Sequence, residues 1–263
     1  ESIRAGLSAE VSVRLTRLEV VWAVGSTNTE LLSRVNPPNG SSEALLAEYQ
    51  TAGRGRRGRA WLAPPGGAIC LSFSWTFKEV PADLGALGLV IGVCELRALR
   101  SLGIANAKLK WPNDVLVDDR KLSGVLIELR AESAGPACVV VGIGLNVALG
   151  APLLEKIAET GIAATDLVTA GLEHPARNAV AAAILDSCLR GLAEFERAGL
   201  LPFLDEWRDA DALRGRMIDV KGAAGDIERG LARGVDLHGA LLVEVADGGL
   251  KKFVSGDVSV RVS

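Results

Sequence analysis

Histidine is scarce in this chain of 263 residues, which has His174 and His238 and no others. Neither histidine lies in a recognisable ligand pair. Zinc sites and the nucleophile–base pairs of hydrolytic triads usually depend on positioned imidazoles. We therefore expect neither a protein-bound metal centre nor a hydrolase of the triad type.

Cysteine is also sparse and shows no C-x-x-C spacing. Each cysteine lies within an apolar run, a pattern typical of buried free thiols in a reducing compartment. This pattern predicts a cytoplasmic protein. The four residues are Cys70, Cys94, Cys138 and Cys188.

Long apolar runs are missing, and no signal peptide is recognisable. The longest uncharged apolar run, Leu84 to Cys94, has 11 residues, about half of what a bilayer requires. We expect no membrane partner. The chain begins at Glu1 rather than at methionine, so the numbering leaves room for residues upstream.

A large excess of one charge is absent as well. The net charge is −3, with 49% hydrophobic and 23% charged residues. These values indicate an ordinary globular chain with one large core and room for a small second domain. They argue against a protein that coats nucleic acid, whose whole surface would be basic.

Against this background, residues 53–59 concentrate four arginines and three glycines in seven positions. Glycine lets backbone N–H groups approach an anion, and guanidinium forks match phosphate oxygens. The pattern predicts a loop that embraces phosphate. An RGG-like nucleic-acid tail and an exposed basic loop without a task are the alternatives. Apolar segments at 45–50 and 60–62 flank the loop directly and disfavour the tail.

The periodicity of the first 211 residues predicts an α+β domain. Polar residues at 26–28 are candidates to cap a helix that continues to Val35. A hairpin with a charged tip is expected at 115–129, with Lys121 at the tip. The expected strands are 18–24, 45–49, 69–77, 115–117, 122–129 and 138–147; the expected helices are 26–35, 81–100, 176–196 and 200–208.

Beyond about Leu213 the sequence pattern changes to short expected strands separated by Gly or Asp turns. Five strands within roughly 50 residues suggest a small β-barrel. We therefore divide the chain into residues 1–211 and 212–263. The expected strands are 217–220, 228–235, 240–245, 250–254 and 258–262.

A second distinctive segment is Lys110–Asp114, with the sequence KWPND. Pro112 keeps Trp111 extended, so several polar or aromatic side chains leave one short piece of chain. Lys121 and Gly124 follow closely. Plain packing of Trp111 and a solvated turn at 118–121 are the alternative interpretations.

Together, five motifs closely resemble the biotin protein ligase family, and they occur in the order found in that family. With the C-terminal strands, the resemblance covers the chain from about residue 20 to its end. It implies a class II synthetase-like catalytic domain, with a mixed, mainly antiparallel sheet flanked by helices, and an SH3-like barrel. The motifs are residues 25–28, 48–59, 110–114, 121–124 and 142–146.

The resemblance implies a two-step ligase reaction. Biotin and ATP, with Mg²⁺, give biotinyl-5′-AMP; a lysine of a biotin carboxyl carrier domain then receives the biotin. A carboxylate must approach a triphosphate, and each pair of unit charges at ~4 Å costs on the order of 4 kcal/mol at an effective dielectric of ~20. Cations must therefore be in place beforehand. Those available are Arg54, Arg56, Arg57, Arg59, Lys110 and Lys121.

The resemblance also implies roles for single residues. Lys121, Arg56 and Asp114 are the candidate catalytic residues. The candidate biotin contacts are Ser26, Thr27, Asn28, Gln50, Gly53, Arg54, Gly55, Arg56, Lys121, Gly124, Gly142 and Gly144. The candidate contacts to ATP or the adenylate are Arg56, Arg57, Arg59, Trp61, Lys110, Asn113, Lys121, Asn146 and Arg261.

Two of these assignments have plain structural alternatives. Asn146 can be a strand-end residue that satisfies backbone groups, and Arg261 can be an ordinary residue near the chain end. Asp114 is a candidate either to orient Mg²⁺ or to receive the proton of the incoming amine.

Two rival functions stay open. A lipoate or octanoate ligase shares the fold, although the polar set Ser26, Thr27, Asn28 and Gln50 favours a ureido ring. A nucleic-acid-binding regulatory protein is the rival of another class. Roughly 17 residues precede the first expected strand, too few for a DNA-reading module. We therefore expect a monofunctional ligase that forms a homodimer and has no nucleic-acid partner.

Overall fold

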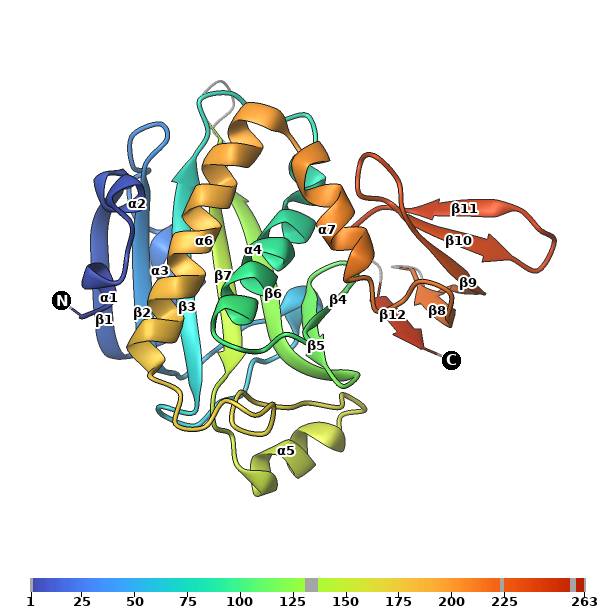
Figure 1. Ribbon diagram of the computed structural model, residues 1–263, viewed down its shortest axis with the longest axis horizontal. Helices are drawn as coiled ribbons and strands as arrows, with labels where there is room; N and C mark the ends of the chain where they lie inside the picture. Colours follow the sequence, from blue (N-terminus) through green and yellow to red (C-terminus); the bar gives the residue numbers. More distant parts are fainter. Residues whose placement is uncertain (1, 131–136, 223–224, 256–258, 263) are drawn as a thin grey trace.

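The computed structural model describes residues 2–130, 137–222, 225–255 and 259–262. Its strands form a seven-stranded sheet with the order β1-β2-β3-β7-β6-β5-β4 and a five-stranded sheet with the order β11-β10-β9-β8-β12 (Figure 1). β1 pairs with β2 in parallel, and the other strand pairs described are antiparallel. The mixed, mainly antiparallel α+β architecture is confirmed.

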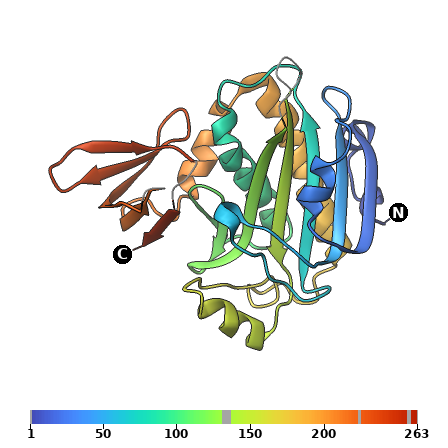
Figure 2. The same ribbon diagram turned by 180° about the vertical axis from the view of Figure 1, so that it is seen from behind.

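Six of the strands of the large sheet lie within a few residues of the expected ranges, whereas β4 was not expected. β3 is buried along its whole length, because helices cover one face and the site elements cover the other (Figures 1 and 2). The strands are β1 (Leu15–Val24), β2 (Ser42–Gln50), β3 (Ala68–Thr76), β4 (Lys108–Lys110), β5 (Asp114–Val117), β6 (Arg120–Arg130) and β7 (Cys138–Asn146).

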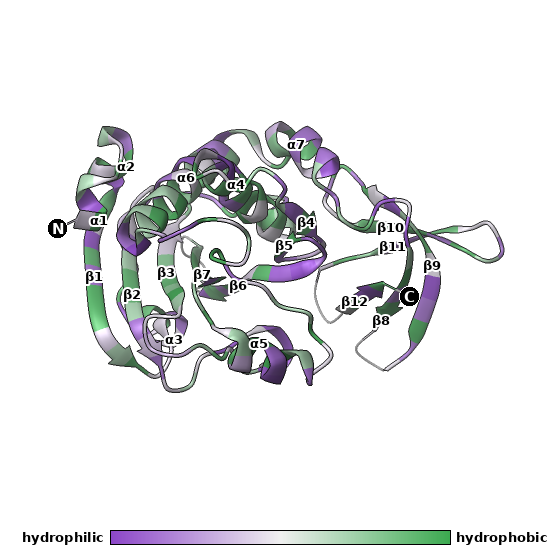
Figure 3. Ribbon diagram, turned by 60° about the horizontal axis from the view of Figure 1, so that its bottom comes forward, coloured by the Kyte–Doolittle hydropathy of each residue, from purple (hydrophilic) through white to green (hydrophobic). Residues whose placement is uncertain are grey.

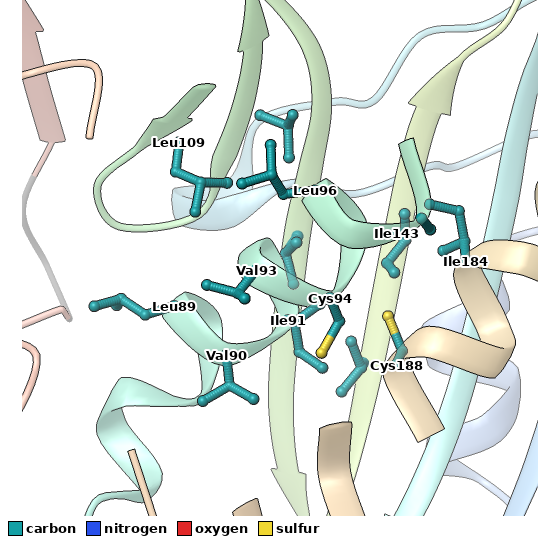
Figure 4. Packing of buried hydrophobic residues seen from close by; sticks show 14 of the residues in the cluster. Leu89, Val90, Ile91, Val93, Cys94, Leu96, Leu109, Ile143, Ile184 and Cys188 are labelled. Carbon is teal, nitrogen blue, oxygen red and sulfur yellow. The ribbon is translucent and has the colours of Figure 1, made fainter. Parts of the chain in front are cut away.

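Two long helices, α4 (Leu87–Ser101) and α6 (Arg177–Ala198), pack side by side on one face of this sheet. Figure 4 shows part of the apolar cluster around these helices, with Cys94 of α4 and Cys188 of α6 facing one another. Gly191 allows the close approach: a Cβ there would lie 2.2 Å from the Cys94 Sγ. α4 begins later than expected because residues 84–86 form a 3₁₀ turn.

Glycines also bring α4 against the KWPND segment. A Cβ at Gly92 would lie 3.3 Å from Leu109, and one at Gly88 would lie 3.1 Å from the Pro112 carbonyl oxygen. The helix thus forms the support on which residues 110–114 rest.

The shorter helices match the expectations less well. Ser26 caps α3 (Thr27–Leu32), which ends three residues before Val35. α1 (Ser2–Ala5), α2 (Ala9–Arg14) and α5 (Ala151–Ala158) were not expected. The helix expected at 200–208 is a 3₁₀ turn, Leu201–Phe203, followed by α7 (Leu204–Asp209).

The C-terminal strands form the expected five-stranded antiparallel sheet, consistent with an SH3-like barrel. Its β9–β10 turn contacts the part of the chain that carries the large sheet: the Trp111 Nε1 donates to the Gly239 carbonyl at 3.0 Å. The domain boundary at residue 211 stays a prediction. The strands are β8 (Met217–Lys221), β9 (Ile227–Val235), β10 (Leu241–Val245), β11 (Leu250–Phe253) and β12 (Ser259–Val262).

Candidate active site

A cavity of about 470 Å³ lies on the sheet face opposite α4 and α6. α3, residues 53–59 and α5 lie on this side of the sheet (Figure 2), and α5 and the barrel flank the β5–β6 hairpin (Figure 3). The structure brings together almost every residue predicted for the site. Lining the cavity are Ser26, Thr27, Asn28, Gln50, Arg54, Gly55, Arg56, Arg57, Arg59, Trp61, Lys110, Asn113, Asp114, Lys121, Gly124, Gly142, Gly144, Asn146 and Arg261.

Gly53 was predicted to contact biotin but does not belong to this lining. It is buried at the base of the loop. Its carbonyl accepts from the Trp61 N–H at 2.9 Å, and a Cβ would lie 2.7 Å from the Trp61 carbonyl oxygen. Gly53 therefore allows the two ends of the loop to pair closely.

Three glycines on β6 and β7 form the floor of the cavity. Gly124 and Gly144 are cross-strand partners. A Cβ at Gly144 would lie 2.4 Å from the Trp61 ring, one at Gly142 2.2 Å from the Asn28 Oδ1, and one at Gly124 2.8 Å from the Lys121 Nζ. Each missing side chain makes room for a polar or aromatic group of the site.

A β-bulge aims Lys121 into the cavity. In the β5–β6 register, Val115 pairs with Ser123 and Leu116 pairs with Lys121, so Leu122 is an extra residue. The bulge shifts the usual alternation. As a result Lys121 shares the cavity face with Gly124, although three positions separate them.

The prediction that Lys121 lies at the hairpin tip was wrong, because Lys121 lies two residues beyond the tip. The tip is Asp118–Asp119, and both residues have positive φ. Lys121 lies within β6, where its Nζ is 2.6 Å from the Asp114 Oδ1 and 5.9 Å from the centre of the Trp61 ring. The ammonium group is thus held between a carboxylate and an aromatic face.

The arginine-rich loop closes on itself. Arg54 pairs with Ala60, the Gly55 N–H donates to the Arg59 carbonyl at 2.7 Å, and Arg57 has a positive φ of 58°. The Arg56 guanidinium donates to the Asn113 Oδ1 at 3.0 Å. This bond joins the loop to the KWPND segment.

Positive charge gathers at the end of the cavity nearest the barrel. Burial lowers the pKa of Lys110, and the nearby charges of Lys121, Arg261 and Arg59 lower it further, while Asp114 opposes them. Four cations around the single Asp114 carboxylate leave an excess of positive charge that a bound anion would offset. The arrangement is suited to a polyphosphate.

The opposite end of the cavity is polar and hydrogen-bonded. Thr27 donates its backbone N–H to the Gln50 Oε1 at 2.8 Å, and the Ser72 hydroxyl lies 2.6 Å from the Asn28 Oδ1. The Asn28 amide and the Arg54 guanidinium both donate to Glu128, at 2.9 and 2.7 Å. Sequence reasoning missed Ser72 and Glu128, although polar residues inside strands that are otherwise apolar were a usable signal.

Asn146 makes the contacts expected of a strand-end residue that satisfies backbone groups. Its Nδ2 donates to the carbonyl oxygens of Thr165 and Lys121, at 2.9 and 3.4 Å. The backbone of Lys121 also binds residues 163 and 165. Asn146 thus fastens the segment after α5 to β6, in addition to lining the cavity. Sequence reasoning missed this segment and Arg216, which pairs with Asp119 at 2.6 Å at the cavity wall.

Within the described ranges, no group of three or more His, Cys, Asp or Glu could hold a metal ion. None of the helices in those ranges has the length and apolarity needed to cross a bilayer.

Comparisons with known proteins agree with this geometry. Residues 23–146 match the biotin/lipoate A/B protein ligase family, and residues 215–261 match the biotin protein ligase C-terminal domain. The bifunctional ligase/repressor BirA of Escherichia coli is 40% identical over 243 residues, which are 92% of this chain and 73% of that protein. Biotin–[acetyl-CoA-carboxylase] ligase of Mycobacterium tuberculosis is 37% identical over 92% of this chain and 88% of that protein.

A solved structure is similar over nearly the whole chain. Biotin protein ligase from Aquifex aeolicus, in complex with biotin and ATP, superposes with a TM-score of 0.79 at 30% identity, covering 95% of this chain and 100% of that one. Sequence and fold thus agree from the first strand to the barrel, and the chain belongs to the biotin/lipoate A/B protein ligase family, with the C-terminal domain of the biotin protein ligases.

Proposed function

We propose that this chain is a biotin–[biotin carboxyl carrier protein] ligase. It activates biotin with ATP to biotinyl-5′-AMP and transfers the biotin to a lysine of a carrier domain. The observation that supports this most is the joining, in one cavity, of a hydrogen-bonding end at Thr27, Asn28 and Gln50 with a cationic end at Lys110, Lys121 and Arg261. The first suits a ureido ring and the second a triphosphate.

In the first step a carboxylate oxygen of biotin attacks the α-phosphorus of ATP. A new P–O bond forms, the bond to the β-phosphate breaks, and pyrophosphate leaves. The carboxylate is already ionised at neutral pH, so the protein's main task is to bring two anions together. We assign the offsetting charge to Lys121, Arg56, Arg59 and Lys110, consistent with their positions around the cavity.

In the second step the amine of a carrier lysine attacks the acyl carbon of the adenylate. A C–N bond forms, the bond to AMP breaks, and the amine releases one proton. Asp114 is the candidate acceptor of that proton. Its present partner is Lys121, at 2.6 Å, and we infer that Lys121 turns from Asp114 to the substrate carboxylate and the phosphoryl oxygens.

Mg²⁺ fits the available donor set as a partner of the nucleotide. Magnesium in nucleotide sites is held by one or two carboxylates together with phosphate oxygens, rather than by a cage of protein ligands. Asp114 supplies such a carboxylate at the cationic end of the cavity. The ion would supply further neutralisation of phosphate charge.

We assign the adenosine to the space framed by Trp61, Asn113 and Asn146, with Arg57 and Arg261 as further contacts from the loop and the barrel. Trp61 presents an aromatic face above Gly144. Asn146 would contribute to the adenosine site partly by holding the segment after α5 in place through its hydrogen bonds.

We further propose a cytoplasmic enzyme that forms a homodimer through a sheet edge. β1 lies at one edge of the large sheet, and Val20 and Trp22 on it are 55% and 72% exposed. Sedimentation velocity with and without biotin and ATP checks this. Sedimentation as a monomer under both conditions contradicts it.

Isotope exchange between ATP and pyrophosphate tests the enzymatic activity. We expect exchange that depends on biotin, and biotinyl-5′-AMP detectable by mass spectrometry. Exchange with lipoate alone would establish the rival ligase instead. A filter-binding titration at physiological salt tests the nucleic-acid alternative, for which we expect no micromolar affinity.

A further inference from the structure

A chain of hydrogen bonds, buried except at its Glu128 end, runs beneath the polar end of the cavity. It begins at Glu128, whose Oε2 accepts from the Asn28 Nδ2 at 2.9 Å. The Asn28 Oδ1 lies 2.6 Å from the Ser72 Oγ, which lies 2.7 Å from the Thr27 Oγ1. Ser72, Asn28 and Thr27 are 0%, 3% and 4% exposed, so water does not compete for these contacts.

The chemistry of Glu128 fixes the direction of the first bond. An ionised carboxylate only accepts hydrogen bonds, and it also binds the Arg54 guanidinium at 2.7 Å. The group of Asn28 that faces it must therefore be the NH₂, which also points to the Leu126 carbonyl oxygen at 3.3 Å. The Asn28 Oδ1 then faces Ser72 as an acceptor.

The donor–acceptor direction of this first bond determines the direction of the next two, because each of the two hydroxyl groups has only one proton to donate. The Ser72 proton goes to the Asn28 Oδ1, because two oxygens 2.6 Å apart in a buried site otherwise repel. The Ser72 oxygen is then an acceptor, and the Thr27 hydroxyl donates to it. The Thr27 Oγ1 also lies 3.1 Å from the Gln50 Oε1, which is a longer contact than the one to Ser72. The Gln50 oxygen already accepts the Thr27 backbone N–H, so it does not need the hydroxyl proton.

We infer that Ser72 is a positioning residue that sets the hydrogen-bond polarity of the biotin ureido site. With the Thr27 proton engaged by Ser72, the Thr27 Oγ1 and the Gln50 Oε1 present lone pairs to the cavity. These acceptors match the two N–H groups of a ureido ring. The inference rests on the proposed function and names a residue that does not itself line the cavity.

The sheet explains why this position is occupied by serine. Ser72 on β3 pairs with Gly142 on β7, and the missing side chain of Gly142 gives Asn28 its space. Asn28 therefore reaches the Ser72 hydroxyl from above the strand. A hydroxyl of this size bridges Thr27 and Asn28, whereas alanine leaves both without that partner.

The test is Ser72→Ala, measured by ATP–pyrophosphate exchange. The freed Thr27 proton can turn toward Gln50 or the ligand, so we expect the KM for biotin to rise about tenfold, the effect of one hydrogen bond. The KM for ATP and the kcat at saturating biotin should change less than about twofold, since the bond acts on the ureido end alone.

Ser74→Ala is the matched control. Ser74 lies on the same face of β3 and is 4% exposed, but its hydroxyl contacts the backbone of Glu43 and lies outside the cavity. We expect this variant to keep the wild-type KM for biotin. Ser72→Cys retains a weak donor and should show an intermediate KM, which keeps the test usable if Ser72→Ala folds poorly.

Three outcomes are distinguishable. An unchanged KM for biotin in Ser72→Ala overturns the positioning role, as does an equal change in the KM for ATP or in Ser74→Ala. Failure of the wild-type protein to exchange with biotin at all would overturn the proposed function instead.

Discussion

Two contacts hold the Lys121 ammonium group: the Asp114 carboxylate at 2.6 Å and the Trp61 ring at 5.9 Å. Replacement by alanine removes the cation while leaving the β6 backbone and its bulge intact. We expect Lys121→Ala to lower biotin-dependent ATP–pyrophosphate exchange at least 100-fold, since charge stabilisation of this kind is typically worth 10²–10³ in rate. Thermal unfolding should stay near that of the wild type.

Lys78→Ala is a suitable control, because Lys78 is exposed on the turn after β3. It should retain full exchange. Near-normal exchange in Lys121→Ala would remove Lys121 from its assigned role.

We propose that Arg56 retains the adenylate; its guanidinium lines the cavity and donates to the Asn113 Oδ1 at 3.0 Å. We expect Arg56→Gly to form biotinyl-5′-AMP but to release it. The measurement is biotin labelling of lysines on an added bystander protein, detected by a streptavidin blot. Arg100→Ala, an exposed change at the end of α4, should label the carrier alone. Unlabelled bystanders in the presence of Arg56→Gly contradict the retention role.

At the residue scale, the sequence predicted the members of the site far better than their contacts. Motifs of adjacent residues, such as KWPND, carry their own signal. Ser72 and Glu128 contribute through partners 44 and 100 positions away, and no spacing within the sequence indicates such pairs. The role of Gly144 likewise depends on its pairing with Gly124 across the sheet.

At the scale of elements, α4 contributes a buried carboxyl group behind the Lys121 bulge. Glu95 is 0% exposed, and its Oε2 accepts from the Ser123 hydroxyl at 2.5 Å. Burial raises its pKa to about 8; the Ser123 bond opposes the rise, Asp114 adds to it, and Lys121 opposes it. The native protein therefore holds a proton that the unfolded chain releases near pH 4.5.

The sign of the resulting pH dependence follows from linkage. Between about pH 4.5 and 8 the native state binds more protons at Glu95, so its contribution to the free energy of unfolding falls as pH rises. Glu95→Gln removes this titration. We expect the stability of Glu95→Gln relative to the wild type to grow with pH, by on the order of a few kcal/mol.

Urea unfolding of both proteins at pH 5.5 and pH 8 measures the difference, in which the contributions of other titratable groups cancel. An equal difference at the two pH values would show that the wild-type carboxyl group titrates normally.

Strands and long helices were predictable because their apolar residues recur regularly between turn residues. α5 was missed because it is only eight residues long and none of them is fully buried, so the short apolar stripe of Leu153, Leu154 and Ile157 does not stand out in the sequence. α1 and α2 bury one residue each, Ile3 and Val11. The bulge in β6 was also unpredictable, since it is defined by the register against β5.

At the scale of the whole molecule, the barrel completes the cavity, because β12 contributes Val260 and Arg261 to its wall. The sequence predicted a barrel but not where it docks; one contact at the docking site is the bond from the Trp111 Nε1 to the Gly239 carbonyl oxygen at 3.0 Å. A Cβ at Gly239 would lie 2.8 Å from the Ala86 Cβ. The barrel turn thus rests in direct contact with the α4 end of the catalytic part.

Trp111→Phe tests whether this bond holds the barrel in register with the cationic end. Phenylalanine keeps an aromatic ring but leaves the buried Gly239 carbonyl without its donor, which costs about 1–3 kcal/mol. We expect the KM for ATP to rise several-fold through displacement of Arg261, with the KM for biotin unchanged. Hydrogen exchange of residues 236–240 should increase.

Trp75→Phe is the matched control for the loss of ring size. Trp75 is 0% exposed on β3, and its Nε1 has no hydrogen-bond partner in the described part of the chain. That variant should lose stability while keeping the wild-type KM for ATP. If Trp111→Phe raises the KM for biotin and for ATP equally, the bond supports the KWPND segment itself, and the barrel is held in place by its other contacts.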